Sequence, residues 1–138
     1  MTAGQRPVPV SATEPSSRSA KPVVLVAEDD ASIRMTLEYL LGFEGFELLF
    51  ASDGCQALDL ARRNLPDVIL LDQVMPRMDG RQVYRELKAD GSTRAIPVLV
   101  LSGMPTERDN DWQGATFIAK PFGIDELVDS IKGALEPL

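Results

Sequence analysis

Several residue types that particular functions require are missing or rare in this chain. It has no histidine and a single cysteine, Cys55, so it can form no internal disulfide, and a reducing cytoplasm is its expected setting. No apolar run approaches the roughly 20 residues of a transmembrane helix, and the first twenty residues lack the basic start and apolar segment of a secretory signal. We therefore expect no membrane partner.

Basic residues are outnumbered as well. The 138 residues include 14 Lys and Arg against 21 Asp and Glu, a formal net charge of −7. This charge opposes nonspecific attraction to nucleic acid, so we expect no direct DNA binding. Residues 1–20 are rich in Pro, Ser, Ala and Thr without periodicity, which predicts a disordered tail followed by one domain over residues 21–138.

Beyond residue 20, short apolar runs alternate with amphipathic stretches. The runs predict strands at 23–27, 46–51, 68–71, 97–101 and 116–119, and apolar residues three or four apart predict helices at 32–42, 56–64, 80–89 and 124–135. A further short helix is expected between Pro105 and Gly114. Because crossovers between parallel strands are right-handed, this alternation predicts an α/β fold, a doubly wound parallel sheet of five strands with helices on both faces.

Four of the predicted strands end on polar residues that can bind phosphate or metal. These residues are Glu28, Asp29 and Asp30 after the first strand, Asp72 after the third, Ser102 after the fourth and Lys120 after the fifth. Open α/β sheets bind ligands at the carboxyl edge of their strands, where these residues would meet. Asp30 is also a suitable N-cap for the first helix.

The acids in this set predict a metal site. Neighbouring strands lie about 4.8 Å apart, and a like-charge pair about 5 Å apart costs roughly 3 kcal/mol at an effective dielectric near 20. Glu28, Asp29 and Asp72 would therefore need a proton or a cation. An oxygen-only site suits Mg²⁺, with Mn²⁺ as a possible substitute, and the absence of Cys and His from the site argues against Zn²⁺.

Four segments carry these residues in a fixed order: 24–34, 67–80, 97–103 and 120–122. Together they resemble the receiver domain of two-component response regulators, similar in layout to the single-domain chemotaxis regulators. The resemblance covers about residues 21–136. It implies a flavodoxin-like sheet with strand order 2-1-3-4-5.

The resemblance also implies roles for the acids. Asp72 would accept a phosphoryl group from a phosphohistidine of a sensor histidine kinase or a histidine phosphotransfer protein. Glu28, Asp29, Asp72 and the backbone carbonyl of Val74 would hold Mg²⁺. With no histidine of its own, the chain could be an acceptor in this exchange but not a histidine donor.

Further roles follow from the same resemblance. Ser102 would donate a hydrogen bond to a phosphoryl oxygen, and Lys120 would pair with Asp72 and then with the phosphoryl group. Phe117 occupies the aromatic switch position and would turn inward when Ser102 moves. The Lys120–Pro121 bond is expected to be cis, as is frequent in the family.

The chain departs from the family pattern at several points. Glu28 replaces the commoner Asp, and Ser102 replaces the commoner Thr. The segment from residue 103 to 119 is shorter than usual, so the fourth helix should be short and the signalling surface remodelled. Val74 and Met104 are apolar where they could otherwise orient attacking water, which predicts slow self-dephosphorylation.

Each of these residues also has a purely structural interpretation. Asp29 could cap the first helix, Asp72 or Ser102 could begin a turn, Lys120 could be a solvated charge, and Phe117 could be a packing residue. Other positions are interpreted as structural only: Arg34 on a solvated helix face, Trp112 and Cys55.

The resulting functional prediction is a phosphorylation switch that alters a protein-binding surface and is no enzyme beyond its own phosphorylation and slow dephosphorylation. No helix-turn-helix or enzymatic segment follows Leu135, so we expect output through a separate, unknown protein or onward phosphoryl transfer. One alternative is a receiver-like interaction module that works without phosphorylation. Another is an aspartyl-nucleophile phosphohydrolase, although such enzymes usually carry a second Asp where this chain has Val74.

Overall fold

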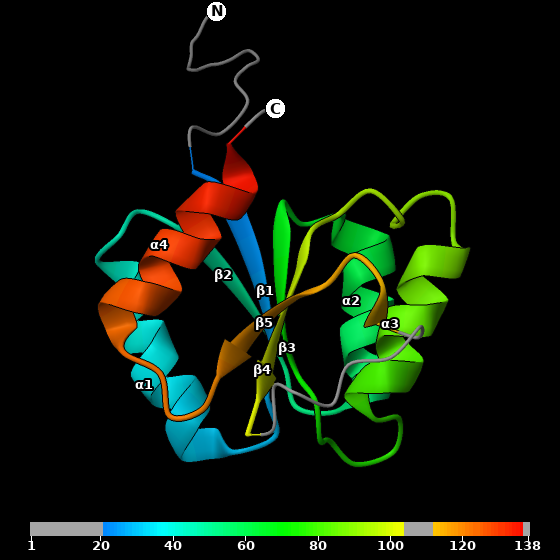
Figure 1. Cartoon of the computed structure of the whole chain (residues 1–138), viewed down its shortest axis with the longest axis horizontal. Helices are drawn as coiled ribbons and strands as arrows, with labels where there is room; N and C mark the ends of the chain where they lie inside the picture. The colour runs from blue at the N-terminus through cyan, green and yellow to red at the C-terminus, as the bar shows by residue number, and fades with distance from the viewer. Residues whose placement is uncertain (1–20, 104–111, 137–138) are drawn as a thin grey trace, which may run out of the picture.

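A single parallel sheet organises the part of the chain that the structure, a computed structural model, describes: residues 21–103 and 112–136. In chain order its elements are β1 (Val23–Ala27), α1 (Ala31–Gly42), β2 (Glu47–Ala51), α2 (Gly54–Asn64), β3 (Val68–Asp72), α3 (Gly80–Ala89), β4 (Val98–Ser102), β5 (Thr116–Ala119) and α4 (Ile124–Leu135). Helices lie on both faces of the sheet (Figure 1).

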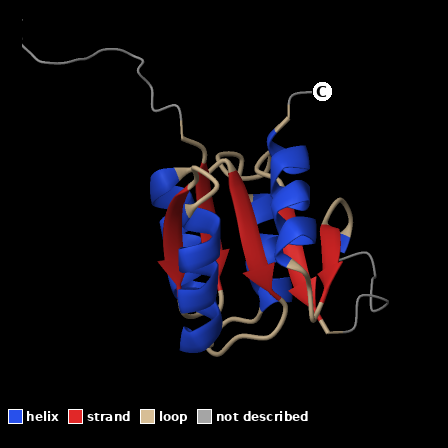
Figure 2. Ribbon diagram, turned by 90° about the vertical axis from the view of Figure 1, so that its left-hand side faces the viewer, coloured by secondary structure: helices blue, strands red, loops and turns tan. Residues whose placement is uncertain are grey.

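The five strands are parallel and lie in the order β2-β1-β3-β4-β5, as predicted. Leu70 of the central strand β3 is aligned with Val26 of β1 on one side and with Leu99 of β4 on the other. Every residue of β3 and of β4 is buried, which explains why both read as continuous apolar runs. The strands all point the same way, so their carboxyl ends meet at one edge of the sheet (Figure 2).

Two hydrophobic clusters cover the two faces of the sheet. Val24 and Val26 pack with Leu37 of α1 and Leu127 of α4, while Leu25 lies in the cluster on the α2 and α3 side. Successive strand residues alternate between the faces, so one apolar strand supplies both clusters. Figure 1 shows α1 and α4 on one side of the sheet and α2 and α3 on the other.

Capping residues set where the helices begin at the carboxyl edge. The Asp30 side chain accepts hydrogen bonds from the amides of Ser32 and Ile33, which confirms the predicted cap. Asp53 caps α2 in the same way and starts it at Gly54, two residues earlier than predicted. The other helix and strand boundaries agree with the predictions to within one residue.

Two predicted segments lie outside the described residues, the tail at 1–20 and most of the short helix between Pro105 and Gly114. The buried ring of Trp112 packs against Tyr84 and Phe117, in keeping with a structural role. Cys55 is exposed and is no core residue. Within the described ranges, no helix combines the length and the apolar character that a membrane span requires.

Candidate functional site

Three carboxylates meet at the carboxyl edge of β1 and β3. Ala27 is aligned with Leu71 in the sheet, so Glu28 and Asp72 follow at neighbouring positions. One carboxylate oxygen from each of Glu28, Asp29 and Asp72 lies within 4.8 Å of the others. The predicted acidic cluster therefore forms, and it forms because β1 and β3 are hydrogen-bonded neighbours.

Glu28 is the buried member of this cluster. Its side chain is 1% exposed, whereas Asp29 is exposed. The Glu28 Oε2 atom accepts a hydrogen bond from the Asp30 amide at 3.2 Å, but Oε1 is buried and has no hydrogen-bond partner among the described residues. Burial raises the pKa of Glu28 to about 7, and the neighbouring Asp72 carboxylate adds to that rise.

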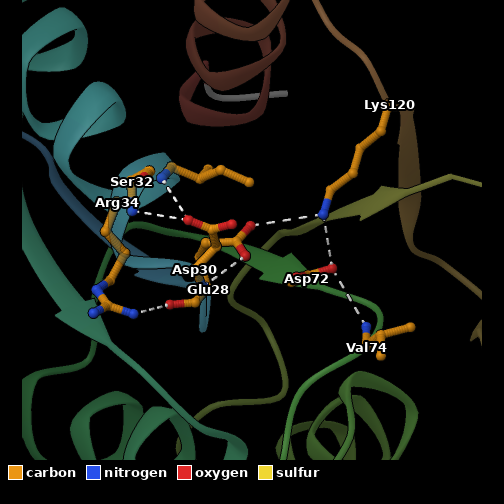
Figure 3. Close-up of polar contacts among 8 residues, drawn as sticks. Glu28, Asp30, Ser32, Arg34, Asp72, Val74 and Lys120 are labelled. Atoms are coloured by element: carbon orange, nitrogen blue, oxygen red, sulfur yellow. Dashed lines mark hydrogen bonds and ion pairs between the residues drawn. The ribbon is translucent and has the colours of Figure 1, made fainter.

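Lys120 faces this pair of acids from the end of β5. Its Nζ lies 3.1 Å from Asp72 Oδ1 and 3.7 Å from Glu28 Oε1 (Figure 3). The Lys120 amide donates to the Ser102 carbonyl at 2.8 Å, which fixes the end of β5 beside β4. The Lys120–Pro121 peptide bond is cis, as expected.

Arg34 is closer to the site than its sequence position suggested. We predicted a solvated residue on the face of the first helix. Instead, Arg34 Nη1 donates to the backbone carbonyl of Glu28 at 2.7 Å, and the side chain is only partly exposed (Figure 3). Arg34 lies one turn into α1, close enough for its long side chain to reach back to the end of β1 and stabilise that end.

The loop after β3 also contacts Asp72. The amide of Val74 donates to Asp72 Oδ1 at 3.3 Å, and the Val74 side chain is 75% exposed. A Cβ atom added at Gly80 would lie 2.5 Å from the Asp72 carbonyl oxygen, so only glycine allows α3 to start this close to the site.

Ser102 lies at the end of β4 and is buried, as is Asp72. The Ser102 hydroxyl donates a hydrogen bond to the side-chain carbonyl oxygen of Gln73. Gln73 was not among the predicted site residues. One signal for it was available, because it is a polar residue immediately after a strand-end carboxylate at a sheet edge.

Phe117 lies in β5, aligned with Val100 of β4. It is half-buried, and its ring makes an edge contact with Trp112 at a centroid distance of 5.4 Å. Phe117 therefore lies on the same side of the sheet as α2 and α3. Its predicted role as a switch remains a prediction, as does that of the Val74 carbonyl as a metal ligand. Met104, the other residue linked to slow dephosphorylation, lies outside the described residues.

The donor set fits a hard divalent cation. All three clustered side chains offer oxygen atoms, and Glu28 Oε1 is a buried acceptor to which no described residue donates a hydrogen bond. Asp29 leaves the cluster open to water on its exposed side. A few carboxylates together with water are the usual environment of Mg²⁺ in proteins.

Comparison with known proteins agrees with this geometry. The sequence model described as "Response regulator receiver domain" matches residues 24–132. The response regulator MprA of Mycobacterium sp. (strain KMS) is 35% identical over 116 residues, which cover 81% of this chain and 50% of that protein. The chain thus spans about half the length of the curated relatives it matches.

Solved structures show the same fold. The receiver domain of the sensor histidine kinase PA1611 from Pseudomonas aeruginosa PAO1, with a magnesium ion in its active-site cleft, is 29% identical with a TM-score of 0.76, covering 84% of this chain and 98% of that one. The chemotaxis response regulator CheY4 of Vibrio cholerae is 28% identical with a TM-score of 0.77, covering 84% and 100%. The chain therefore belongs to the response regulator receiver domain family of two-component signalling.

Proposed function

We propose that this receiver domain accepts a phosphoryl group on Asp72 and uses it to change a protein-binding surface. The observation that carries the proposal is the position of Asp72, whose carboxylate lies 3.1 Å from the Lys120 ammonium and beside two further acids. A nucleophilic carboxylate, a cation and a cluster of metal-binding oxygens are the groups that phosphoryl transfer requires.

In the proposed transfer, an Asp72 oxygen attacks phosphorus. The P–O bond forms as the P–N bond to the donor's imidazole breaks, and the imidazole nitrogen takes the electron pair. Lys120 lies where its ammonium can pair with the incoming phosphoryl oxygens. Mg²⁺, held by Glu28, Asp29, Asp72 and the Val74 carbonyl, would supply positive charge to offset that of the phosphoryl group, and Mn²⁺ would serve as a substitute.

The donor in this proposal is a phosphohistidine of a sensor histidine kinase or of a histidine phosphotransfer protein, and the output is a separate protein. We propose that the exchange takes place in the cytoplasm, where a chain with one cysteine stays reduced. The domain itself contacts neither DNA nor a membrane in this scheme, because its net negative charge opposes both.

The switch would connect the site to the surface through Ser102 and Phe117. The Ser102 hydroxyl would move to a phosphoryl oxygen, and Phe117 would turn inward in response. The aspartyl phosphate should then hydrolyse slowly. The exposed side chain of Val74 has no polar atom with which to orient an attacking water.

The test is to incubate the purified chain with acetyl phosphate and Mg²⁺ and to map the modified peptide by mass spectrometry. We expect one added phosphoryl group, located on Asp72 and absent from Asp72→Ala. Failure to gain mass would favour the interaction module that works without phosphorylation. Rapid, multiple-turnover release of phosphate would favour the phosphohydrolase, and either result would contradict the proposal.

A further inference from the structure

A hydrogen bond beside Asp72 affects the energy of the proposed phosphorylation switch. The Ser102 hydroxyl donates to the side-chain oxygen of Gln73, the residue that directly follows Asp72. We propose that Gln73 is a positioning residue that holds the Ser102 hydroxyl in the unphosphorylated protein and competes with the phosphoryl group for its proton. This inference rests on the proposed function and adds a second residue that sets the energy of switching.

The backbone of Gln73 is fixed on two sides. Its amide donates to the Leu101 carbonyl at 3.1 Å, and its carbonyl accepts from the Gly80 amide at 3.0 Å. A Cβ atom at Gly80 would lie 2.9 Å from Gln73 Cα, so the start of α3 is in close contact with this residue. Gln73 therefore presents its side chain from a rigid support, as a positioning residue must.

The register of the sheet brings the two side chains together. Asp72 is aligned with Leu101 of β4, so the residues that follow them, Gln73 and Ser102, occupy the next pair of positions. Ser102 is 1% exposed, which leaves its hydroxyl dependent on protein groups for its hydrogen bonds. The side-chain oxygen of Gln73 is one such group.

Proton counting makes the two bonds exclusive. A serine hydroxyl has one proton, and both the Gln73 carbonyl oxygen and a phosphoryl oxygen can only accept it. When Ser102 donates to a phosphoryl group on Asp72, it must stop donating to Gln73. The bond to the charged phosphoryl oxygen is the stronger of the two, so the exchange is favourable, but the bond lost to Gln73 reduces the gain.

The experiment measures binding of beryllofluoride with Mg²⁺, a stable mimic of the aspartyl phosphate, by isothermal titration calorimetry. Replacing Gln73→Met keeps the length of the side chain but removes the acceptor. We expect binding to tighten about three- to tenfold, the value of one hydrogen bond. In a Ser102→Ala background the same substitution should change nothing, because the shared proton is gone.

A matched control is available in the same chain. Gln56 Oε1 accepts a hydrogen bond from the Ser52 hydroxyl at 3.1 Å, beyond the end of β2. Gln56→Met removes the same kind of serine–glutamine bond, and we expect it to leave beryllofluoride binding at the wild-type value. Tightening in Gln56→Met equal to that in Gln73→Met would overturn the specific role of Gln73.

A second readout needs no phosphorylation. In the metal-free protein, the side-chain amide resonances of Gln73 should shift when Ser102 is replaced by Ala, since Gln73 loses its hydroxyl partner. Unchanged resonances, or Gln73→Met binding beryllofluoride no more tightly than wild type, would overturn the inference alone. If the resonances shift but wild type binds no beryllofluoride, the hydrogen bond between Ser102 and Gln73 exists but the proposed function is wrong. The competition between Gln73 and a phosphoryl group is then overturned as well.

Discussion

At the ends of β1 and β3, three carboxylates lie within 4.8 Å of one another, whereas at the end of β4 a serine hydroxyl donates to a neutral carboxamide. The first region, Glu28 with Asp29 and Asp72, concentrates like charge around a buried Glu28 oxygen that accepts no hydrogen bond within the described part of the chain. In the second region, the Ser102 hydroxyl proton is bound by the side-chain oxygen of Gln73, and neither side chain carries a charge. Of these two regions, the acidic one alone has a strong electrostatic reason to take up a cation.

The largest expected effect comes from removing the buried charge of the acidic region. The pKa of Glu28 is raised from 4.5 to about 7, so its contribution to stability is present below pH 4.5 and is lost as the pH rises through about 7. In metal-free protein at pH 8.5, Glu28→Gln should raise the free energy of unfolding by up to about 3 kcal/mol. At pH 4.5 the two proteins should be about equally stable.

Urea denaturation in the presence of a chelator measures this difference. Asp29→Asn is the matched control, because it removes a neighbouring charge that is exposed, and we expect a change within about 0.5 kcal/mol. A Glu28→Gln protein less stable than wild type at pH 8.5 would show that the ionised carboxylate is stabilising. The acidic region would then have no electrostatic need for a cation, and it would not differ from the region of Ser102 and Gln73 in that respect.

The next effect tests the rigidity of the second region. Gly80→Ala would place a Cβ atom 2.5 Å from the Asp72 carbonyl oxygen and 2.9 Å from Gln73 Cα. The backbone must shift to avoid this overlap, so Gly80→Ala should lower the free energy of unfolding by about 1 to 3 kcal/mol, measured by chemical denaturation.

Gly133→Ala is the control for this substitution. No atom of residues 21–103 or 112–136 comes within 4 Å of a Cβ atom built at Gly133 in α4, so Gly133→Ala should raise the free energy of unfolding by up to about 1 kcal/mol. Equal stability changes for the two alanine variants would mean that the loop after Asp72 adapts easily. That loop could then not hold the Gln73 backbone in the fixed position that the proposal requires.

The smallest effect concerns the cation that the protein itself supplies. Lys120 Nζ lies 3.1 Å from Asp72 and 3.7 Å from Glu28, so it shares the negative charge that a bound metal would use. Lys120→Met should therefore tighten Mg²⁺ binding at pH 8.5 about three- to tenfold in calorimetric titrations. Lys132→Met, which removes a surface ion pair with Glu44, should leave Mg²⁺ affinity unchanged. Weaker binding in Lys120→Met would mean that Lys120 organises the acids instead of competing for them.

Much of this arrangement could be predicted from the sequence, because it depends on strand ends. Glu28, Asp72 and Lys120 meet since each directly follows an apolar run that becomes a strand of one parallel sheet. The same logic placed Asp30 as a cap. The metal site was predicted from the acids themselves, whereas the strand order and the roles of Asp72, Ser102 and Lys120 in phosphoryl transfer came from the family resemblance.

Other features depend on side-chain direction, which residue spacing does not determine. Glu28 and Asp29 are adjacent and chemically alike, yet one is buried and the other exposed. Arg34 was predicted to lie on a solvated face of the first helix, but its side chain is long enough to reach back to the Glu28 carbonyl. The contact of Gln73 with Ser102 joins residues 29 positions apart and depends on the conformation of both side chains.

The most direct test of the central claim is the affinity of the chain for Mg²⁺ as a function of pH. Because Glu28 must lose its proton before it can bind a cation, we predict that affinity rises up to about tenfold per pH unit below pH 7 and levels off above it. In Glu28→Gln, affinity should be lower and nearly independent of pH between 6 and 8.5. A wild-type affinity that stays flat across this range would contradict the account, since it would mean that no buried carboxylate gives up a proton when the metal binds.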